Sequence, residues 1–247
     1  MFSENLARIR TRIQQACQRS GRDPSSVTLV CVTKGISVEM VRRVIALGVI
    51  DVGENRVQEA HAKQAASLRP QASGSVLQPA ACSLQPVRWH LVGHLQRNKA
   101  KDAVDLFDVI HSLDSVALAE ELDHQAGKRD RKLTVFLQVN VSGETTKFGC
   151  RSEEAASLAQ AIGRLPHLRL VGLMAMAPFV ENPEQARPYF RQLRLLRDAI
   201  HQELVHSSLV TRHSSLHLSM GMSQDFEVAI EEGADVVRIG TAIFKGA

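Results

Sequence analysis

The stretch VTLVCVTK, residues 27–34, decides the fold of this chain. Its first seven residues are all apolar or β-branched, which is typical of a parallel strand that helices cover on both faces. Side chains alternate along such a strand, so Val30, Val32 and Lys34 share one face and Cys31 and Thr33 share the other. If Val30 and Val32 face a barrel axis, the Lys34 ammonium lies at the carboxyl end of the strand, where barrel active sites are built. Pairing of Lys34 with a carboxylate such as Glu54 at the rim is the alternative.

The same alternation of helix and strand continues through the rest of the chain. After the strand at 27–33, apolar runs predict strands at 50–55, 88–93, 107–112, 133–141, 168–176, 216–219 and 235–239, with helical patterns between them. Eight strands that alternate with helices favour a closed (β/α)8 TIM barrel, with an open doubly wound sheet as the alternative.

The two ends of the chain support closure. Residues 2–20 carry apolar side chains at helical spacing and stop at Gly21, which predicts an extra N-terminal helix. The chain continues only briefly after the eighth strand, so no full eighth helix is expected. We therefore expect the N-terminal helix to cover the position beside strands one and eight, within a single domain spanning residues 1–247. Residues 69–86, rich in Pro, Ser, Ala and Gln, are expected to form a flexible surface insertion that contains Cys82.

Composition narrows the class of function. The formal net charge is +4, and eight Phe, one Trp and one Tyr leave few platforms for stacking bases, so nucleic acid is not an expected partner. The sequence contains no apolar run long enough to span a membrane and no signal peptide. The four cysteines form no CxxC pair, which argues against disulfides and a zinc knuckle. We expect a cytoplasmic protein.

Two loops near the C-terminus predict a phosphate site. The seventh strand runs into Ser219-Met220-Gly221-Met222-Ser223 and then a helix at 224–232, and the eighth runs into Gly240-Thr241. Small residues let backbone N–H groups and hydroxyls approach a phosphate, and a helix N-terminus adds a favourable dipole. The alternative is that Ser223 is only the N-cap of the helix.

Arg238 adds a third signal. Alternation along residues 236–239 turns the apolar Val237 and Ile239 towards the helices and therefore turns Arg238 into the barrel. A buried guanidinium is costly unless a carboxylate such as Glu54, or a ligand atom, accepts its hydrogen bonds.

At this point the sequence resembles the pyridoxal phosphate homeostasis proteins. The resemblance covers the chain outside the insertion and is carried by VTK (32–34), GENRVQE (53–59), WHLVGHLQRNK (89–99), GLMAM (172–176), SMGMSQDFEVAI (219–230) and VRIGTAIF (237–244). It implies a barrel like the N-terminal domain of alanine racemase, with pyridoxal 5'-phosphate (PLP) held as a lysine aldimine.

The resemblance also implies roles for individual residues. Lys34 is the Schiff-base lysine, Arg238 faces the pyridine nitrogen, and Asn55 lies near the ring. The residues of the phosphate loops are Ser219, Gly221, Ser223, Gly240 and Thr241. One departure is Gly35-Ile36-Ser37, where the family commonly has a second lysine and a proline.

Histidines 90 and 94 are four residues apart, which is a zinc spacing only on a helix, and this segment is predicted as strand and turn. We therefore interpret them as core or rim histidines, with His90 in the family motif near the cofactor, and we expect no metal.

Two functions remain. Either the chain is a non-catalytic monomer that buffers PLP and delivers it to apo PLP-dependent enzymes, or it is a racemase-like enzyme. Racemisation commonly needs a lysine and a tyrosine from a second domain. We expect no second domain after the barrel, and the only tyrosine, Tyr189, is predicted on a long helix away from the barrel mouth. An arginine at the pyridine nitrogen also weakens the ring as an electron sink. We therefore favour the first function. Lys147, in the loop after the fifth strand, is either a solvated lysine or a second amine for cofactor transfer.

Overall fold

The computed structural model describes residues 2–67, 87–209 and 215–245. The strands are β1 (Thr28–Val32), β2 (Asp51–Glu54), β3 (Arg88–Leu91), β4 (Val109–Leu113), β5 (Leu133–Asn140), β6 (Cys150–Arg151), β7 (Leu168–Met174), β8 (His217–Ser219) and β9 (Val236–Ile239). The α-helices are α1 (Phe2–Arg19), α2 (Val38–Ala46), α3 (Val57–Ser67), α4 (Ala100–Leu106), α5 (Val116–Gly127), α6 (Ala155–Gly163), α7 (Arg187–His206), α8 (Phe226–Glu231) and α9 (Thr241–Phe244). Short 3-10 helices span Pro24–Ser26, Arg97–Lys99, Ser152–Glu154 and Pro183–Ala186.

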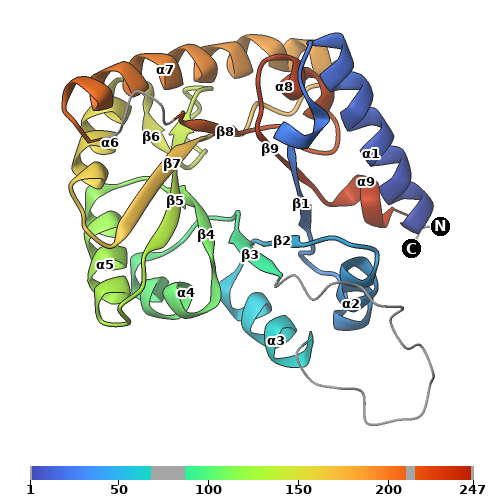
Figure 1. Ribbon diagram of the computed structural model, residues 1–247, viewed down its shortest axis with the longest axis horizontal. Coiled ribbons are helices and arrows are strands. Elements are labelled where there is room, and N and C mark those ends of the chain that lie inside the picture. Colours follow the sequence, from blue (N-terminus) through green and yellow to red (C-terminus); the bar gives the residue numbers. More distant parts are fainter. Residues whose placement is uncertain (1, 68–86, 210–214, 246–247) are drawn as a thin grey trace.

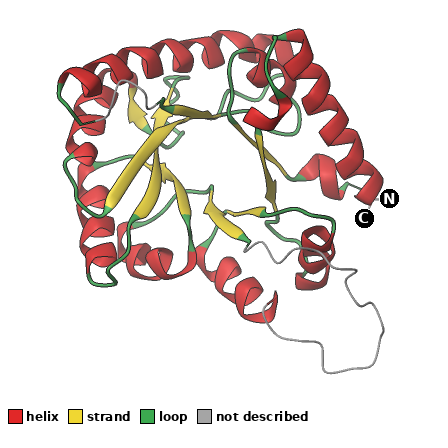
Figure 2. Cartoon of the chain, viewed as in Figure 1, coloured by secondary structure: helices red, strands yellow, loops and turns green. Residues whose placement is uncertain are grey.

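The strands close into a parallel barrel. β1 pairs with β2 on one side and with β9 on the other, and β4 pairs with β5, so the order β1-β2-β3-β4-β5-β7-β8-β9 returns to β1. Figure 1 and Figure 2 show the strands in a ring inside a surrounding layer of helices. The predicted (β/α)8 barrel is confirmed and the open sheet is excluded. Sequence reasoning did not predict β6, a two-residue strand that pairs in parallel with the carboxyl end of β5.

Alternation along β1 sorts its side chains into two cores, as predicted. Val30 packs inside the barrel in a small cluster with Val92, Phe136, Met174 and Val236. Cys31 belongs instead to the larger core between the strands and the helices. This side-chain direction is what brings Lys34, two residues after Val32, to the inner rim of the barrel.

The N-terminal helix covers the gap beside the first and last barrel strands, as expected. α9 is only a single turn, and the Asn5 side chain of α1 donates to the carbonyl oxygens of Ile243 and Lys245 at its end. Arg12 of α1 also bonds Glu227 of α8 at 2.6 Å. In Figure 1, α1 runs along α8 and α9 at the edge of the barrel.

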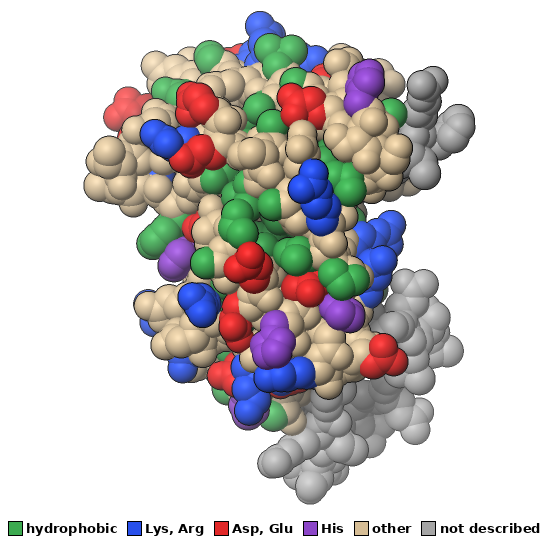
Figure 3. Space-filling model, turned by 90° about the vertical axis from the view of Figure 1, so that its left-hand side faces the viewer, with side chains coloured by type: hydrophobic (Ala, Val, Ile, Leu, Met, Phe, Trp, Pro, Cys, Tyr) green, Lys and Arg blue, Asp and Glu red, His purple; other side chains and the backbone are tan. Residues whose placement is uncertain are grey.

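The surface carries both signs of charge. In the side view of Figure 3, acidic and basic side chains are interspersed on the face shown, with hydrophobic side chains between them. Among the described helices, none is long and apolar enough to cross a membrane. The expected insertion at 69–86, including Cys82, lies outside the described residues.

Candidate functional site

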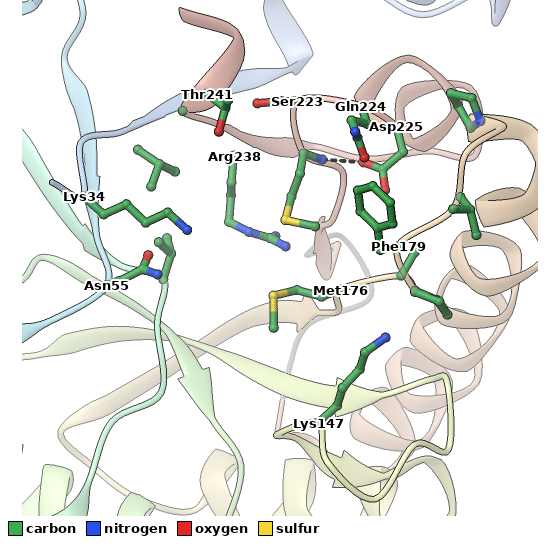
Figure 4. Close-up of a pocket in the computed structure, with 18 residues that line it drawn as sticks. Lys34, Asn55, Lys147, Met176, Phe179, Ser223, Gln224, Asp225, Arg238 and Thr241 are labelled. Atoms are coloured by element: carbon green, nitrogen blue, oxygen red, sulfur yellow. Dashed lines mark hydrogen bonds between the residues drawn. The ribbon is translucent and has the colours of Figure 1, made fainter. Parts of the chain in front are cut away.

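A cavity of about 530 Å³ lies at the carboxyl ends of the strands. This volume is within the usual range for small-molecule sites. Its lining comes from segments that follow β1, β2, β3, β5, β7, β8 and β9, and includes the predicted residues Lys34, Asn55, Ser223, Arg238, Gly240 and Thr241. Figure 4 shows Lys34 and Lys147 on opposite sides of the cavity, with Arg238 and Met176 between them.

Lys34 presents an ammonium without a partner. It is exposed at the rim, because the strand ends at Val32 and a turn begins. Among the described residues, nothing forms a hydrogen bond or ion pair with its ammonium. The alternative pairing with Glu54 is wrong, since Glu54 is bonded by the buried Lys63 at 2.6 Å. The Lys34 amine therefore remains available to a ligand.

The backbone around Lys34 is held in place by neighbouring side chains. The Lys63 ammonium donates to the Thr33 carbonyl at 2.6 Å, and the Thr33 hydroxyl donates to Glu54. On the other side, the Gly35 N–H donates to Glu59 at 3.2 Å. Gly35 has a positive φ of 68°, a conformation that glycine adopts without strain. These contacts fix the turn that presents Lys34.

Arg238 points into the barrel, as alternation predicts, and is 4% exposed. It donates to the Ser219 hydroxyl at 2.6 Å and to the Ala175 carbonyl at 2.9 Å, and not to Glu54. Burial lowers the pKa of Arg238 to about 10, although the nearby Asp225 acts in the opposite direction. Both acceptors are neutral, so the guanidinium faces the cavity without a carboxylate bonded to it among the described residues.

Two loops supply unpaired backbone N–H groups to the cavity. Within the described ranges, the N–H groups of Ser223, Gln224, Gly240 and Thr241 donate to no protein acceptor, and all four residues line the cavity. The Ser223 hydroxyl accepts from Ala242 N–H at 3.2 Å and so joins the two loops. Unpaired N–H groups and hydroxyls of this kind form anion-binding sites.

The helix after β8 begins later than predicted. α8 spans Phe226–Glu231 with Asp225 as its N-cap residue, so the helix expected at 224–232 is present but begins two residues later, and the N-cap alternative for Ser223 is wrong. Residues 222–225 instead form a turn in which Asp225 accepts from Met222 N–H at 2.6 Å. Burial raises the pKa of the Asp225 carboxyl.

Ser219 and Gly221 lie below the cavity rather than on its lining. Ser219 is fully buried and its hydroxyl contacts Arg238 and His111. Gly221 has a φ of 91°, and an added Cβ would lie 2.6 Å from Ala229 Cβ. Both residues therefore shape the site from behind, through Arg238 and the turn.

Lys147 also lines the cavity, on the loop between β5 and β6. Its ammonium bonds Glu144 at 2.7 Å. The loop is held by Asn140, whose amide donates to the carbonyls of Glu144 and Lys147 at 2.8 and 3.3 Å. The next residue, Phe148, stacks on His94 with ring centroids 3.9 Å apart. Sequence reasoning missed Asn140 and the β6 pairing, because both depend on how the loop returns to the sheet.

The predicted histidines occupy two different places. His90 lies inside the barrel, where it bonds Asp51 and His111, and it is not part of the cavity lining. His94 lies at the mouth beside Phe148. Sequence reasoning also missed His111 and the lining residues 177–180, since no motif marked them, and it gave no role to Met176, which ends the GLMAM motif.

The chain matches the family described as alanine racemase, N-terminal domain, over residues 5–247. Pyridoxal phosphate homeostasis proteins of Aquifex aeolicus and Pseudomonas aeruginosa are each 41% identical to it, over 98% of this chain and 96% and 94% of theirs. The protein of that name from Escherichia coli K12 is 35% identical, over 98% of this chain and 95% of its own.

Solved structures show the same architecture. PipY of Synechococcus elongatus with PLP bound is 33% identical, with a TM-score of 0.80 over 99% of this chain and 100% of PipY. A Bifidobacterium adolescentis protein is 37% identical, with a TM-score of 0.85 over 98% and 94% of the two chains. An alanine racemase from Clostridium difficile has a TM-score of 0.69 over 98% of this chain and 56% of its own, and at 13% identity shares the fold alone.

Proposed function

The chain belongs to the alanine racemase N-terminal domain family and, within it, to the pyridoxal phosphate homeostasis proteins, and we propose that it binds PLP at Lys34 and contributes to vitamin B6 homeostasis. The observation that carries the proposal is the Lys34 amine, which has no partner among the described residues and opens onto a cavity of suitable size.

The lining residues fit each part of this cofactor. Lys34 would hold the cofactor through its amine, and the cofactor would supply the aldehyde with which a lysine amine can react. Gly240, Thr241, Ser223 and Gln224 would hold the phosphate through their unpaired N–H groups. Arg238 has two of its five N–H donors engaged, by Ser219 and Ala175, and would use another towards the pyridine nitrogen. Asn55 would lie beside the ring.

Buffering and delivery of the cofactor, rather than turnover of a substrate, is the role that we propose for this site. Tyr189 sits on α7 among core side chains and is not on the cavity lining, so a tyrosine base is missing from the described site. Arg238 supports the same role, because an arginine at the ring nitrogen weakens the cofactor as an electron sink. No observation in the described residues favours racemisation, and apo PLP-dependent enzymes are the proposed recipients.

Borohydride reduction of the cofactor-loaded protein, followed by peptide mapping, tests the proposal. We expect a visible absorption band near ~420 nm before reduction and a covalent label on Lys34 after it. Lys34→Ala should remove both signals. Lys147→Ala, which removes the other lysine of the cavity lining, should keep them. A label found only on another lysine would refute the assignment.

A further inference from the structure

A chain of buried polar side chains crosses the barrel interior beneath the cavity. Starting from Arg238 on β9, it passes through Ser219 on β8, His111 on β4 and His90 on β3 to Asp51 on β2. The successive donor–acceptor distances are 2.6, 2.8, 2.9 and 2.9 Å. Each of the five residues is at most 5% exposed. We call these residues the interior relay.

The two ends of the interior relay lie in different surroundings. Arg238 lines the cavity at the carboxyl end of the barrel. Asp51 borders a surface hollow at the amino end, where it is also bonded by the half-exposed Arg88. Between them, the His111 ring stacks on Phe136, with centroids 4.5 Å apart. The relay is therefore a continuous connection between the candidate site and the opposite end of the barrel.

The chemistry of the two ends dictates the direction of every hydrogen bond. A guanidinium can only donate and an ionised carboxylate can only accept. Ser219 therefore accepts from Arg238 and donates its own proton to His111 Nδ1. His111 then donates from Nε2 to His90 Nδ1, and His90 donates from Nε2 to Asp51. For two neutral imidazoles, this order of donors places the proton of each ring on Nε2.

The electrostatics at both ends of the histidine pair agree with this pattern. Burial, assisted by the charge of the nearby Arg238, lowers the pKa of His111 well below its usual range. Burial acts to raise the pKa of Asp51, but hydrogen bonds from His90 and Arg88 outweigh it and leave the pKa below the ordinary value. A neutral His111 and an ionised Asp51 are what the relay requires.

The opposite direction of the hydrogen bonds would leave the Ser219 hydroxyl unsatisfied. With His111 protonated on Nδ1, Ser219 would receive two donors and its own hydroxyl proton would lack an acceptor among these residues. We propose that Asp51, His90 and His111 are positioning residues, which act through Ser219 to hold the Arg238 guanidinium against the cavity. The effect of this positioning on PLP binding rests on the proposed function, whereas the direction of the hydrogen bonds in the relay does not.

Asp51→Asn tests the proposal from the far end, away from the cavity lining. An amide can donate as well as accept, so it no longer fixes the direction of the relay. Asp108→Asn is the matched control, because Asp108 also precedes a strand at the amino end and pairs with Arg131, but lies outside the relay. Ser219→Ala is the second variant, and it breaks the bridge to Arg238 without adding volume.

The first measurement uses nitrogen chemical shifts of the imidazoles in the cofactor-free protein. We expect Nε2-protonated His90 and His111 in the parent and in Asp108→Asn, and a mixed or reversed tautomer in Asp51→Asn. The second follows the absorption band of bound PLP against pH. Asp51→Asn and Ser219→Ala should shift the titration midpoint and weaken PLP binding about tenfold, the scale of one lost hydrogen bond to a charged group.

The two measurements separate the two proposals. Failure of the parent protein to bind PLP would refute the proposed function, while the tautomer result would still decide whether the relay has one direction. An Nδ1-protonated His111 in the parent overturns the relay. The positioning role is overturned if folded Asp51→Asn and Ser219→Ala both bind PLP and titrate like Asp108→Asn. If Asp51→Asn does not fold, Ser219→Ala decides the positioning role in the same assay.

Discussion

The charged side chains at the two ends of the barrel differ in whether they form ion pairs. At the carboxyl end, Lys34 and Arg238 face the cavity without a bonded carboxylate among the described residues. At the amino end, aspartates pair with arginines. Asp51 bonds Arg88 at 2.8 Å, and Asp108 and Asp235 bond Arg131 and Arg22 at 2.9 Å each.

The aspartates of the amino end also complete the backbone. Asp235 accepts from Leu218 N–H at 2.8 Å, and Asp108 accepts from Trp89 N–H at 2.8 Å, so each ties the start of its own strand to a neighbouring strand. Lys34 and Arg238, which bond no carboxylate among the described residues, therefore mark the ligand site, whereas the aspartate–arginine pairs of the amino end hold the barrel together. Variants at the carboxyl end should therefore affect binding, and variants at the amino end should affect stability, except at Asp51, which the interior relay connects to Arg238.

Gly240→Val should have the largest effect on the carboxyl end. A Cβ at this position would lie 2.8 Å from the Val32 carbonyl oxygen, so the loop must shift away from β1 and its unpaired N–H groups move with it. We expect PLP affinity to fall about 100-fold, or ~2.7 kcal/mol. Ser223→Ala, which keeps every backbone N–H, should cost less. Equal affinity of Gly240→Val and the parent in equilibrium titration would remove the phosphate from these loops.

Asp235→Ala should give the largest effect at the amino end. It leaves the Leu218 N–H and the Arg22 guanidinium without their carboxylate. We expect the free energy of unfolding to fall by about 2 kcal/mol, with PLP affinity unchanged. Asp198→Ala, which removes an exposed pair with Arg197, should cost less than about 0.5 kcal/mol. A loss of affinity in Asp235→Ala without loss of stability would contradict the division between the ends.

His111, which lies between the two ends, should make stability depend on pH. Its pKa in the folded protein is well below the ordinary value of 6.5. Below pH 6.5 the unfolded chain therefore binds a proton that the native protein does not. As the pH is lowered below this value, the free energy of unfolding decreases by about 1.4 kcal/mol per pH unit.

Urea unfolding between pH 7 and pH 5.5 measures this contribution. The parent protein should lose more stability over this range than His111→Gln. His124→Gln, at an exposed position on α5, should behave like the parent. Parallel curves for the parent and His111→Gln would show that His111 is not held neutral.

Lys147→Ala should have the smallest effect on the folded protein. Its pair with Glu144 is partly exposed, so we expect a change in stability of ~0.5 kcal/mol or less. Because Lys147 lines the same cavity as Lys34, we expect cofactor transfer to an apoenzyme to slow several-fold while the Lys34 label is kept. Transfer kinetics equal to those of the parent would leave Lys147 as a solvated loop lysine.

The order of the barrel strands and the face on which Arg238 lies could be predicted from the sequence, which also favoured a closed barrel over an open sheet. These features are local or periodic, because the side chains of a strand alternate and a buried parallel strand is apolar along its length. The carboxyl-end position of Lys34 and of both glycine-containing loops also followed, since all barrel loops after strands open on one face.

Which side chains form contacts with one another could be seen only in the tertiary structure. From the sequence, Glu54 could pair equally well with Lys34 or with Arg238, but in the structure it pairs with Lys63 of α3. The relay from Asp51 to Arg238 joins residues up to 187 positions apart along the chain on five strands, as the two residue numbers give. The periodicity of the sequence does not predict such contacts, because they depend on strand register and barrel closure. Both are set only when the whole ring of strands has formed.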